Sequence, residues 1–426
     1  MARGARGALR DPAVARRNWL VCVGLLVAVV AAAFGAIVME QPDVPAEARL
    51  PASKVLRIIG SSLPLVGRAV DVSDVDPWDR DRVLALRVPR VLLAIVVGAA
   101  LAVAGAVMQS FFQNPMASPY ILGVASGASL GAAVAFAAGS LFAFGTRGFA
   151  LGLQGEFYAF CAGLVVGYIA YVLARSGTRM KAPIPLLIGI AACACANLLF
   201  RLGVRSPLVS LQSVLAFAGA LGVTFLVYAL ARRGGRVNTT LLLLTGIAVG
   251  TFAGALAYML MFLFTEQTIG QVLRWVMGTL MNRGWGELAV AGPVAVVGIA
   301  FVRFYARDLN VMLLGEDTAQ HLGVHVGRTR LVLLVVSSLL TAVAVAAVGI
   351  IGFVGLVVPH VMRLVVGPDH RWLLPASVLG GALLVLGADA LVRSLPHESV
   401  PLGVLTTLVG CPFFIVLLTR RQKTFI

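Results

Sequence analysis

Few residues in this chain could carry out chemistry, and none is spaced for a nucleotide or metal site. The three lysines, Lys54, Lys181 and Lys423, stand outside any Gly-x-x-x-x-Gly-Lys-Ser/Thr string, the loop whose backbone amides hold ATP phosphates. The five histidines are scattered and form no His-Glu-x-x-His zinc pattern. We therefore predict no catalytic residue, no metal site and no cofactor on this chain.

One acid stands out inside an apolar run, Asp389. An ionisable side chain at membrane depth marks a functional site by default, whereas pairing with Arg393 one helical turn further on would make it structural. The sequence leaves both interpretations open. Ion-coupled carriers usually display several midplane carboxylates or broken-helix ion sites, so their scarcity here predicts that the energy source for any transport lies on another chain.

These side chains are embedded in a strongly apolar sequence. Hydrophobic residues make up 60% of the 426 positions and charged residues 12%, with a mean hydropathy of +0.96. A soluble protein could not cover that much apolar surface, whereas helices of ~20 residues can present it to lipid. The cysteines all lie in apolar runs, where we expect them to pack rather than bind metal or form disulfides: Cys22, Cys161, Cys193, Cys195 and Cys411.

The apolar runs predict an all-α, polytopic transmembrane helical bundle with about 10–12 spans. Twelve runs qualify: 18–39, 88–110, 120–142, 156–175, 183–202, 211–232, 240–264, 287–305, 329–350, 353–366, 372–393 and 401–419. We place them in one transmembrane domain, residues 18–420, between a basic amino end, 1–17, and a carboxyl end, 421–426. An even span count puts both arginine-bearing ends in the cytoplasm, as the positive-inside bias requires. The net charge of +16 therefore reflects membrane topology rather than binding to nucleic acid.

A repeat with an offset of 57 residues organises the middle of the chain. The string Tyr171–Arg179 recurs in register as Tyr228–Arg236. We interpret residues 156–202 and 211–264 as a duplicated helical hairpin. Because a hairpin adds two spans, everything downstream keeps its orientation.

A weaker repeat relates the two halves of the chain. Gly105 precedes Pro115 by ten residues, and Gly349 precedes Pro359 by ten in a similar apolar setting. Transporters often contain such paired halves, with the substrate pathway at their interface. The repeat therefore predicts that these two segments lie near a path.

Glycines at helical spacing predict close helix packing, because they let neighbouring backbones approach in lipid. Two sets lie at i, i+4 and i+8: Gly123, Gly127 and Gly131, then Gly246, Gly250 and Gly254. In the first copy of the hairpin the second set reads Gly189, Cys193 and Asn197, whose larger side chains hold neighbours further off. We therefore expect residues 240–264 near the core and 183–202 at the periphery.

The most informative polar segment lies within residues 306–328, between two spans on the predicted cytoplasmic face. Asp317 or Thr318 is placed to cap a short helix, and Gly323 to end it. A short amphipathic helix of this kind suits docking into a partner's groove. A solvated connecting loop is the alternative.

Several strings resemble the FecCD-type permeases of ABC importers for iron–siderophore complexes, haem and cobalamin. Their order and spacing cover about residues 80–136 and 215–420. The strings are Arg87–Arg90, Gln113–Pro119, Leu122–Gly131, Trp275–Gly278, Gly315–Gly323, Gly349–His360, Gly367–Arg371 and Gly410–Phe414. The resemblance implies a type II importer permease fold, in which family members show ten spans, so the duplicated hairpin is a departure.

The resemblance also implies partners and site residues. It implies cytoplasmic ABC ATPase subunits that hold ATP and Mg, an extracytoplasmic substrate-binding protein, and a second permease copy or paralogue. Residues 306–328 become a cytoplasmic coupling loop that contacts the ATPases through Gly315, Glu316, Asp317, Ala319, His321, Leu322 and Gly323. Arginines at the outer mouth would grip acids of the binding protein: Arg87, Arg90 and Arg393. We expect the path to be lined by Gln109, Asn114, Pro115, Gly349, Gly352, Pro359 and His360.

Together these features predict a transport subunit rather than an enzyme, crossing the cytoplasmic membrane many times and working as a homodimer or paired permease. Iron–siderophore-type chelates are the expected cargo, with haem and cobalamin as alternatives, because selection rests on a separate binding protein. An ion-coupled secondary carrier is the alternative mechanism, and a membrane sensor or scaffold is a third class that would show no transport.

Overall fold

The computed structural model describes residues 12–421, with gaps at 41, 43, 46–48, 63–69, 72, 144–210, 234–235, 263–265 and 396–399. The first half contains α2 (Pro12–Val38), α3 (Ala52–Ser62), α4 (Pro77–Asp81), the π-helix η3 (Arg82–Arg87), α5 (Val88–Phe111), the 3₁₀ turn η4 (Pro119–Leu122) and α6 (Val124–Ala143). The middle contains α9 (Leu211–Ala231), β1 (Arg232–Arg233), β2 (Arg236–Val237), α10 (Thr239–Met261), α11 (Glu266–Val276) and α12 (Trp285–Phe304). The last part contains α13 (Ala306–Met312), α14 (Glu316–His321), α15 (Val326–Val348), α16 (Val354–Val366), α17 (His370–Arg393) and α18 (Leu402–Arg421).

The apolar helices match ten of the predicted spans. Within the described residues, seven helices are long and apolar enough to cross a membrane, and α6, α16 and α18 contain shorter apolar stretches. Helix ends fall within a few residues of the prediction, apart from α2, which begins at Pro12. The predicted all-α bundle is confirmed, with one antiparallel two-residue ribbon, β1–β2, between α9 and α10. The predicted spans 156–175 and 183–202 lie outside the described residues. The expectation that residues 240–264 lie near the core is wrong, because α10 packs only on α6, α9 and η4 among the described element pairs in close contact and exposes large side chains such as Phe252 and Tyr258.

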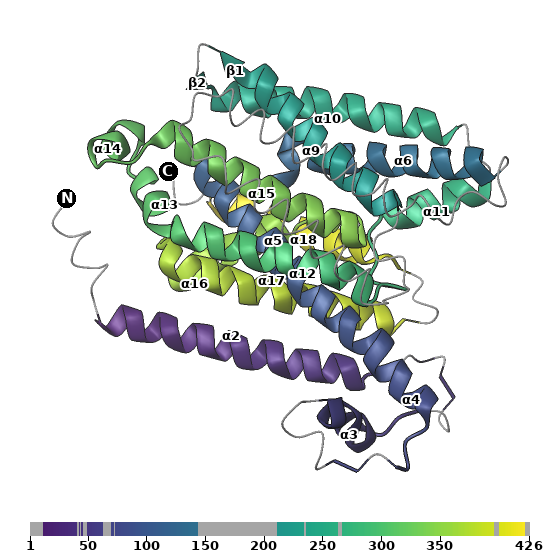
Figure 1. Cartoon of the computed structure of the whole chain (residues 1–426). Helices are drawn as coiled ribbons and strands as arrows, with labels where there is room; N and C mark the ends of the chain where they lie inside the picture. The colour runs from purple at the N-terminus through teal and green to yellow at the C-terminus, as the bar shows by residue number, and fades with distance from the viewer. Residues whose placement is uncertain are drawn as a thin grey trace.

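Helix α5 runs through the middle of the bundle, with α12, α15, α16 and α17 packed around it (Figure 1). Every residue from Gly98 to Phe111 is buried. Two glycines permit this. A Cβ on Gly98 would lie 2.6 Å from the carbonyl carbon of Gly381 in α17, and one on Gly105 would lie 2.7 Å from the Cα of Gly355 in α16. Helix association in lipid depends on such close packing, so the sequence of small residues in α5 fixes its neighbours.

Helices α6, α9 and α10 form a second group that packs through the glycine ridges. On α6, a Cβ at Gly127 would lie 2.9 Å from the carbonyl carbon of Gly219, and one at Gly131 would lie 2.5 Å from that of Leu215, both in α9. The α10 ridge packs on the start of α6, with Gly246 against Ile121, Gly250 against Gly123 and Gly254 beside Ser126. At Gly127, Gly131 and Gly246 the neighbouring backbone is therefore too close for a side chain, whereas Gly250 and Gly254 make ordinary van der Waals contacts.

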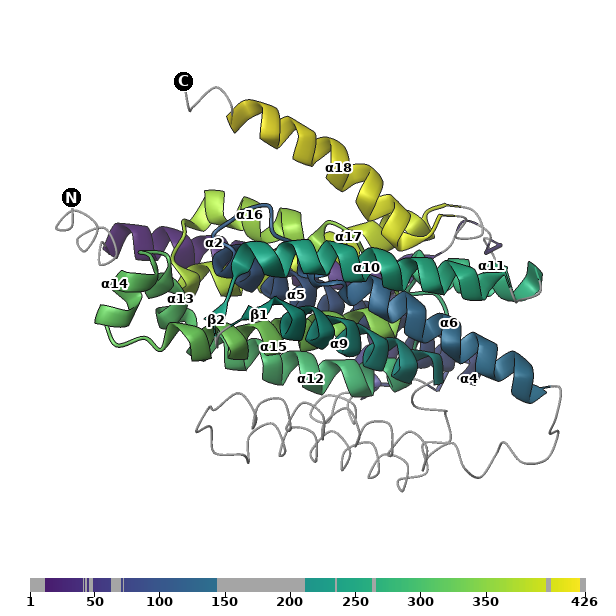
Figure 2. The same ribbon diagram turned by 90° about the horizontal axis from the view of Figure 1, so that it is seen from above.

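Two helices lie at the edge of the bundle. Helix α2 packs along α17, and the Asn18 amide, itself buried, donates a hydrogen bond to the Val366 carbonyl at 2.9 Å. Helix α18 begins beside α17 and tilts away from the other helices toward its carboxyl end (Figure 2). Both leave large apolar side chains exposed, Trp19 and Val27 on α2 and Leu408 and Val409 on α18 among them. We expect lipid to cover much of this surface.

Candidate translocation and coupling site

The coupling loop, residues 306–328, folds as two short helices, α13 and α14, at one end of the bundle (Figure 1). Gly315, with φ +102°, precedes α14, so the predicted cap at Asp317 or Thr318 is wrong. The helix begins at Glu316, because the glycine makes the turn and the two acids of the first turn face the positive end of the helix dipole. Gly323, with φ +86°, follows the helix as predicted and lets the chain turn back.

One face of α14 is anchored and the other is exposed. Ala319 is fully buried in a small cluster with Met312 and Val326. Glu316, half exposed, forms an ion pair with Arg330 of α15. The exposed face carries Asp317, Gln320, His321 and Leu322. A short helix that is held from behind and presents mixed polar and apolar groups fits docking into a groove, although Ala319 itself is turned inward.

Gln109 joins the end of α5 to α16. Its amide nitrogen donates to the Leu356 carbonyl at 2.9 Å, and the Arg363 guanidinium donates to its amide oxygen at 2.9 Å. The side chain is 2% exposed. This predicted path residue therefore lies in a helix contact inside the chain, and its path-lining role stays a prediction that the packing of α5 does not favour.

We expect Gln109→Leu to lower the free energy of unfolding by ~1–3 kcal/mol, because the substitution removes a buried acceptor of Arg363 and a buried donor to α16. The thermal midpoint of the detergent-solubilised chain measures this. Thr251→Val is the control, since Thr251 is exposed and, within the part of the chain that the structure describes, its hydroxyl donates to the Ile247 carbonyl of its own helix alone. Equal thermal midpoints for the two variants would show that the Gln109 hydrogen bonds do not contribute to stability.

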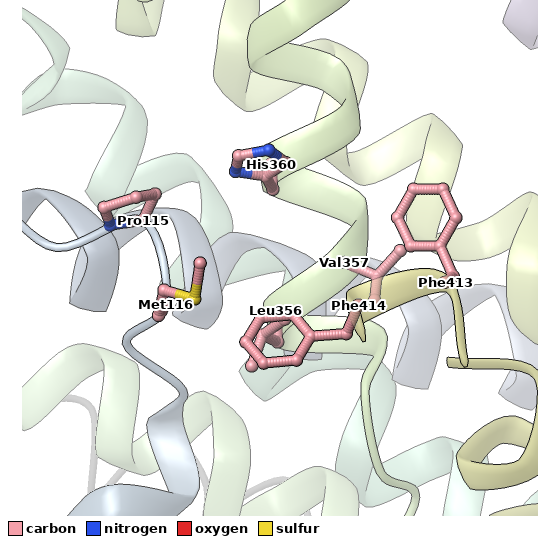
Figure 3. Close-up of a pocket in the computed structure, with 7 residues that line it drawn as sticks. All are labelled: Pro115, Met116, Leu356, Val357, His360, Phe413 and Phe414. Carbon is pink, nitrogen blue, oxygen red and sulfur yellow. The ribbon is translucent and has the colours of Figure 1, made fainter. Parts of the chain in front are cut away.

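A small pocket lies where the turn after α5 meets α16 and α18 (Figure 3). Its lining consists of Pro115, Met116, Leu356, Val357, His360, Phe413 and Phe414. Two predicted path residues, Pro115 and His360, thus come together here, with Pro359 buried beside them in α16. Asn114 lies in the exposed turn and accepts a hydrogen bond from the Met116 amide at 2.9 Å. The walls are aromatic and aliphatic with one imidazole, which can contact an apolar molecular face but offers no catalytic pair.

The predicted path residues Gly349 and Gly352 lie in the break between α15 and α16. Gly349 has φ +80°, and a Cβ there would lie 2.9 Å from the Cα of Gly278. A Cβ on Gly352 would lie 2.9 Å from the Thr407 hydroxyl of α18. Backbone hydrogen bonds tie the same segments together: Thr279 N to Val348 O at 2.7 Å, Leu402 N to Gly278 O at 3.0 Å and Gly403 N to Met277 O at 3.0 Å. The two glycines therefore lie where three backbone segments meet: the turn after α11, the break between α15 and α16, and the start of α18.

The arginines predicted at the outer mouth are turned toward carboxylates of the same chain. Arg90 contacts Asp389 at 2.8 Å, and Arg393 contacts the same carboxylate at 3.1 Å. Asp389 is 1% exposed. Of the two interpretations left open by the sequence, the structural pairing of Asp389 with Arg393 is present, and Arg90 extends it. A docking role for these arginines stays a prediction.

Arg87 is likewise buried and holds the end of α2. It forms an ion pair with Glu40, which also pairs with Arg82 at 2.9 Å, and it donates to the Ile37 carbonyl at 3.0 Å. Arginine at the carboxyl end of a helix suits the dipole there. Glu40 was not among the predicted site residues. Its position directly after the first apolar run, with Arg82 and Arg87 just before the second run, could have indicated an ion pair.

The segment after α2 carries exposed acids that are kept ionised. Hydrogen bonds from Arg57 hold the pKa of the Asp74 carboxyl below its ordinary value. The Ser73 amide donates to Asp71 at 2.9 Å and lowers the pKa of that carboxyl too. This face therefore presents a fixed set of charges outside the membrane-spanning helices.

A profile of the FecCD transport family matches residues 47–197 and 185–420, which together cover most of the chain. The chain belongs to the FecCD transport family. The two matches overlap at residues 185–197, inside the first copy of the predicted hairpin duplication. The FecCD assignment makes the chain an ABC importer permease and a multi-pass protein of the cell membrane, with ATPase and substrate-binding partners implied in general terms.

Several FecCD-type relatives are similar over most of their length. The cobalamin import permease BtuC of Halobacterium salinarum is 39% identical over 79% of this chain and 73% of its own. The hemin permease HmuU of Yersinia pestis is 37% identical over 80% and 84%, and the ferric dicitrate permease FecD of Escherichia coli is 34% identical over 79% and 84%. A solved chain described as a metal-chelate type ABC transporter in an inward-facing conformation has a TM-score of 0.65 at 24% identity, covering 94% of this chain and 99% of that one. That likeness concerns the fold alone.

Proposed function

We propose that this chain is the membrane-spanning subunit of an importer that carries iron–siderophore-type metal chelates into the cell. Separate ATPase subunits with ATP and Mg would power it, an extracytoplasmic binding protein would deliver the chelate, and a second copy of the chain would complete the path. The observation that carries this proposal is α14, an exposed short helix anchored to the bundle in a chain without a phosphate-binding loop.

The geometry of α14 supports energy input from another chain. Its inner face is packed on α13 and α15 through Ala319, and its outer face is free for contact. Force applied to Asp317 or Leu322 would therefore act on a part of the chain that is tied to the core. A proton-driven carrier would need an exchangeable acid within the membrane, whereas Asp389 is held between two arginines.

We propose a metal chelate as the cargo because of the compounds after which the relatives are named. They are named for cobalamin, hemin and ferric dicitrate, which share a bound metal within an organic ligand. Haem and cobalamin are the other candidates, and mass spectrometry of the ligand held by the purified cognate binding protein distinguishes all three.

Reversing the charge of α14 should uncouple the chain from its ATPase. We expect Glu316→Lys with Asp317→Lys to abolish co-purification of the ATPase subunit and to reduce chelate uptake to background, because both acids lie in the first turn of the exposed helix. Asp317→Lys alone separates docking from loss of the Glu316–Arg330 ion pair. Glu266→Lys, at an exposed acid of α11 on the opposite end of the bundle, is the control (Figure 1). Normal uptake and ATPase capture by the double variant would show that the docking assignment is wrong.

A further inference from the structure

A chain of hydrogen bonds, partly buried at Asn310 and buried at His370 and Ser110, runs from the coupling loop to the last turn of α5. Asn310 of α13 accepts two hydrogen bonds at its amide oxygen, from the His370 backbone amide at 2.8 Å and from His370 Nδ1 at 2.7 Å. Its amide nitrogen donates to Asp369 at 2.6 Å. This pattern fixes the orientation of the Asn310 amide and places a proton on Nδ1 of His370, since two hydrogen-bond acceptors do not face each other.

The other ring nitrogen of His370 reaches α5. Nε2 lies 2.6 Å from the Ser110 hydroxyl, which also lies 2.9 Å from the Ala106 carbonyl. With Nδ1 protonated, a neutral imidazole accepts at Nε2, so one hydroxyl proton serves two acceptors. His370 is fully buried and Ser110 is 3% exposed. The hydroxyl can therefore bond either its own helix or α17 without leaving its place.

Two further contacts connect the same turn of α5 to the coupling loop. Gln113 donates to the Met312 carbonyl of α13 at 3.1 Å. The Arg330 guanidinium lies 5.6 Å from the centroid of the Phe111 ring and pairs with Glu316 of α14. Both helices of the coupling loop thus reach the end of α5, α13 by a direct hydrogen bond and α14 through Arg330 of α15.

We propose that His370 is a positioning residue that transmits displacement of the coupling loop to the inner end of α5 through the chain Asn310–His370–Ser110. The proposal rests on the proposed function, because it assumes that partner subunits move α14. Such a displacement would also affect α16, through the residue next to Ser110. Gln109 is bonded to α16, so a shift of this turn reaches the helix that carries His360 and the pocket.

The first test measures chelate moved per ATP hydrolysed in proteoliposomes containing the full transporter. His370→Phe keeps a ring of similar size and removes both ring bonds, and Ser110→Ala removes the bond on the other side. For each we expect a drop of about tenfold in this ratio, the factor equivalent to ~1.4 kcal/mol, within the range for a broken buried hydrogen bond. Because both variants break one link, the double variant should be no worse than either single variant.

The matched control is Ser377→Ala. Ser377 is fully buried on the same helix, α17, and its hydroxyl has no hydrogen-bond partner among the described residues. We expect this variant to keep the wild-type ratio of transport to hydrolysis. A merely structural role for His370 predicts instead a lower thermal midpoint with transport and hydrolysis reduced in parallel, which would overturn the proposal.

A second readout needs no chelate and so stands apart from the proposed cargo. Spin labels are placed on two exposed residues, Asn114→Cys beyond α5 and Thr318→Cys in α14, in a chain whose five native cysteines are changed to alanine. In the transporter assembled with its ATPase subunits, we expect one narrow distance distribution that is the same with and without nucleotide, and a broadened one in His370→Phe. If the wild type moves no chelate but its labels give these distances, the proposed cargo is wrong and the proposed role of His370 is supported. If His370→Phe and Ser110→Ala both keep the wild-type distances and the wild-type transport ratio, the proposed role of His370 is wrong, while the proposed function is unaffected.

Discussion

Gly105→Ala should prevent α5 from seating against α16 and give a poorly folded permease. A Cβ at this position would lie 2.5 Å from the carbonyl carbon of Gly355 and 2.7 Å from its Cα. Both obstructing atoms belong to backbone, so no side-chain rotation relieves the overlap and the helices must separate. Overpacking of this kind costs ~1–3 kcal/mol and sometimes more, and in lipid the close approach is itself the source of association.

Gly222→Ala provides a matched control with the opposite sign. Gly222 lies inside α9, and no atom of the described residues lies within 4 Å of a Cβ built there. Alanine is favoured over glycine inside a helix by up to ~1 kcal/mol, so this variant should be as stable as the wild type or slightly more so. Thermal midpoints and monodispersity in detergent measure both. A Gly105→Ala protein as stable as Gly222→Ala would mean that α5 and α16 are further apart than in this structure.

Asp389→Asn should be the most damaging single change of a charged residue. The substitution preserves the shape of the side chain but removes the negative charge that Arg90 and Arg393 share. Removing one partner from a buried ion pair costs ~3–5 kcal/mol, because the remaining charges stay desolvated. We expect loss of folded protein, measured as the yield of monodisperse permease from membranes and its thermal midpoint.

The control for Asp389→Asn is Asp74→Asn, which breaks an ion pair with Arg57 on the exposed segment before α4. The Asp74 side chain is 60% exposed, so water and salt screen the interaction and little stability should be lost. If Asp389→Asn is as well tolerated as Asp74→Asn, the cluster is dispensable for folding. That outcome would return Asp389 to the list of candidates for a transport role.

The positions of the spans could be predicted from the sequence because lipid imposes them. A helix that crosses the membrane needs an uninterrupted apolar run, and ten such runs appear as helices close to their predicted bounds. The i, i+4, i+8 glycines likewise lie where helices meet, with Gly127 against Gly219 and Gly246 against Ile121. Which helix each ridge would meet could not be predicted, since glycine spacing specifies close approach but not the partner.

The candidate site was predictable in location and less so in contacts. The coupling loop was found from its polarity between two spans, but its cap was misplaced, because Gly315 at positive φ outcompetes the side-chain cap at Asp317. The arginines were identified by motif, and the Asp389–Arg393 pair was one of the two interpretations of Asp389, because the residues lie one helical turn apart. The pairs Arg87–Glu40 and Arg90–Asp389 could not be predicted, since they join residues 47 and 299 positions apart. His370 lies in the family string Gly367–Arg371, but nothing in the sequence indicated its role, since its bonds to Asn310 and Ser110 join residues 60 and 260 positions away.

Uptake by reconstituted proteoliposomes tests most directly whether this permease is moved by other chains. Liposomes containing the purified permease alone, with a proton or sodium gradient and labelled chelate outside, should accumulate nothing. Adding the cognate ATPase subunits, the loaded binding protein and internal ATP with Mg should give accumulation that stops with a non-hydrolysable nucleotide. Gradient-driven accumulation by the permease alone would contradict the claim that other chains move this permease, even if adding the partners increased uptake further.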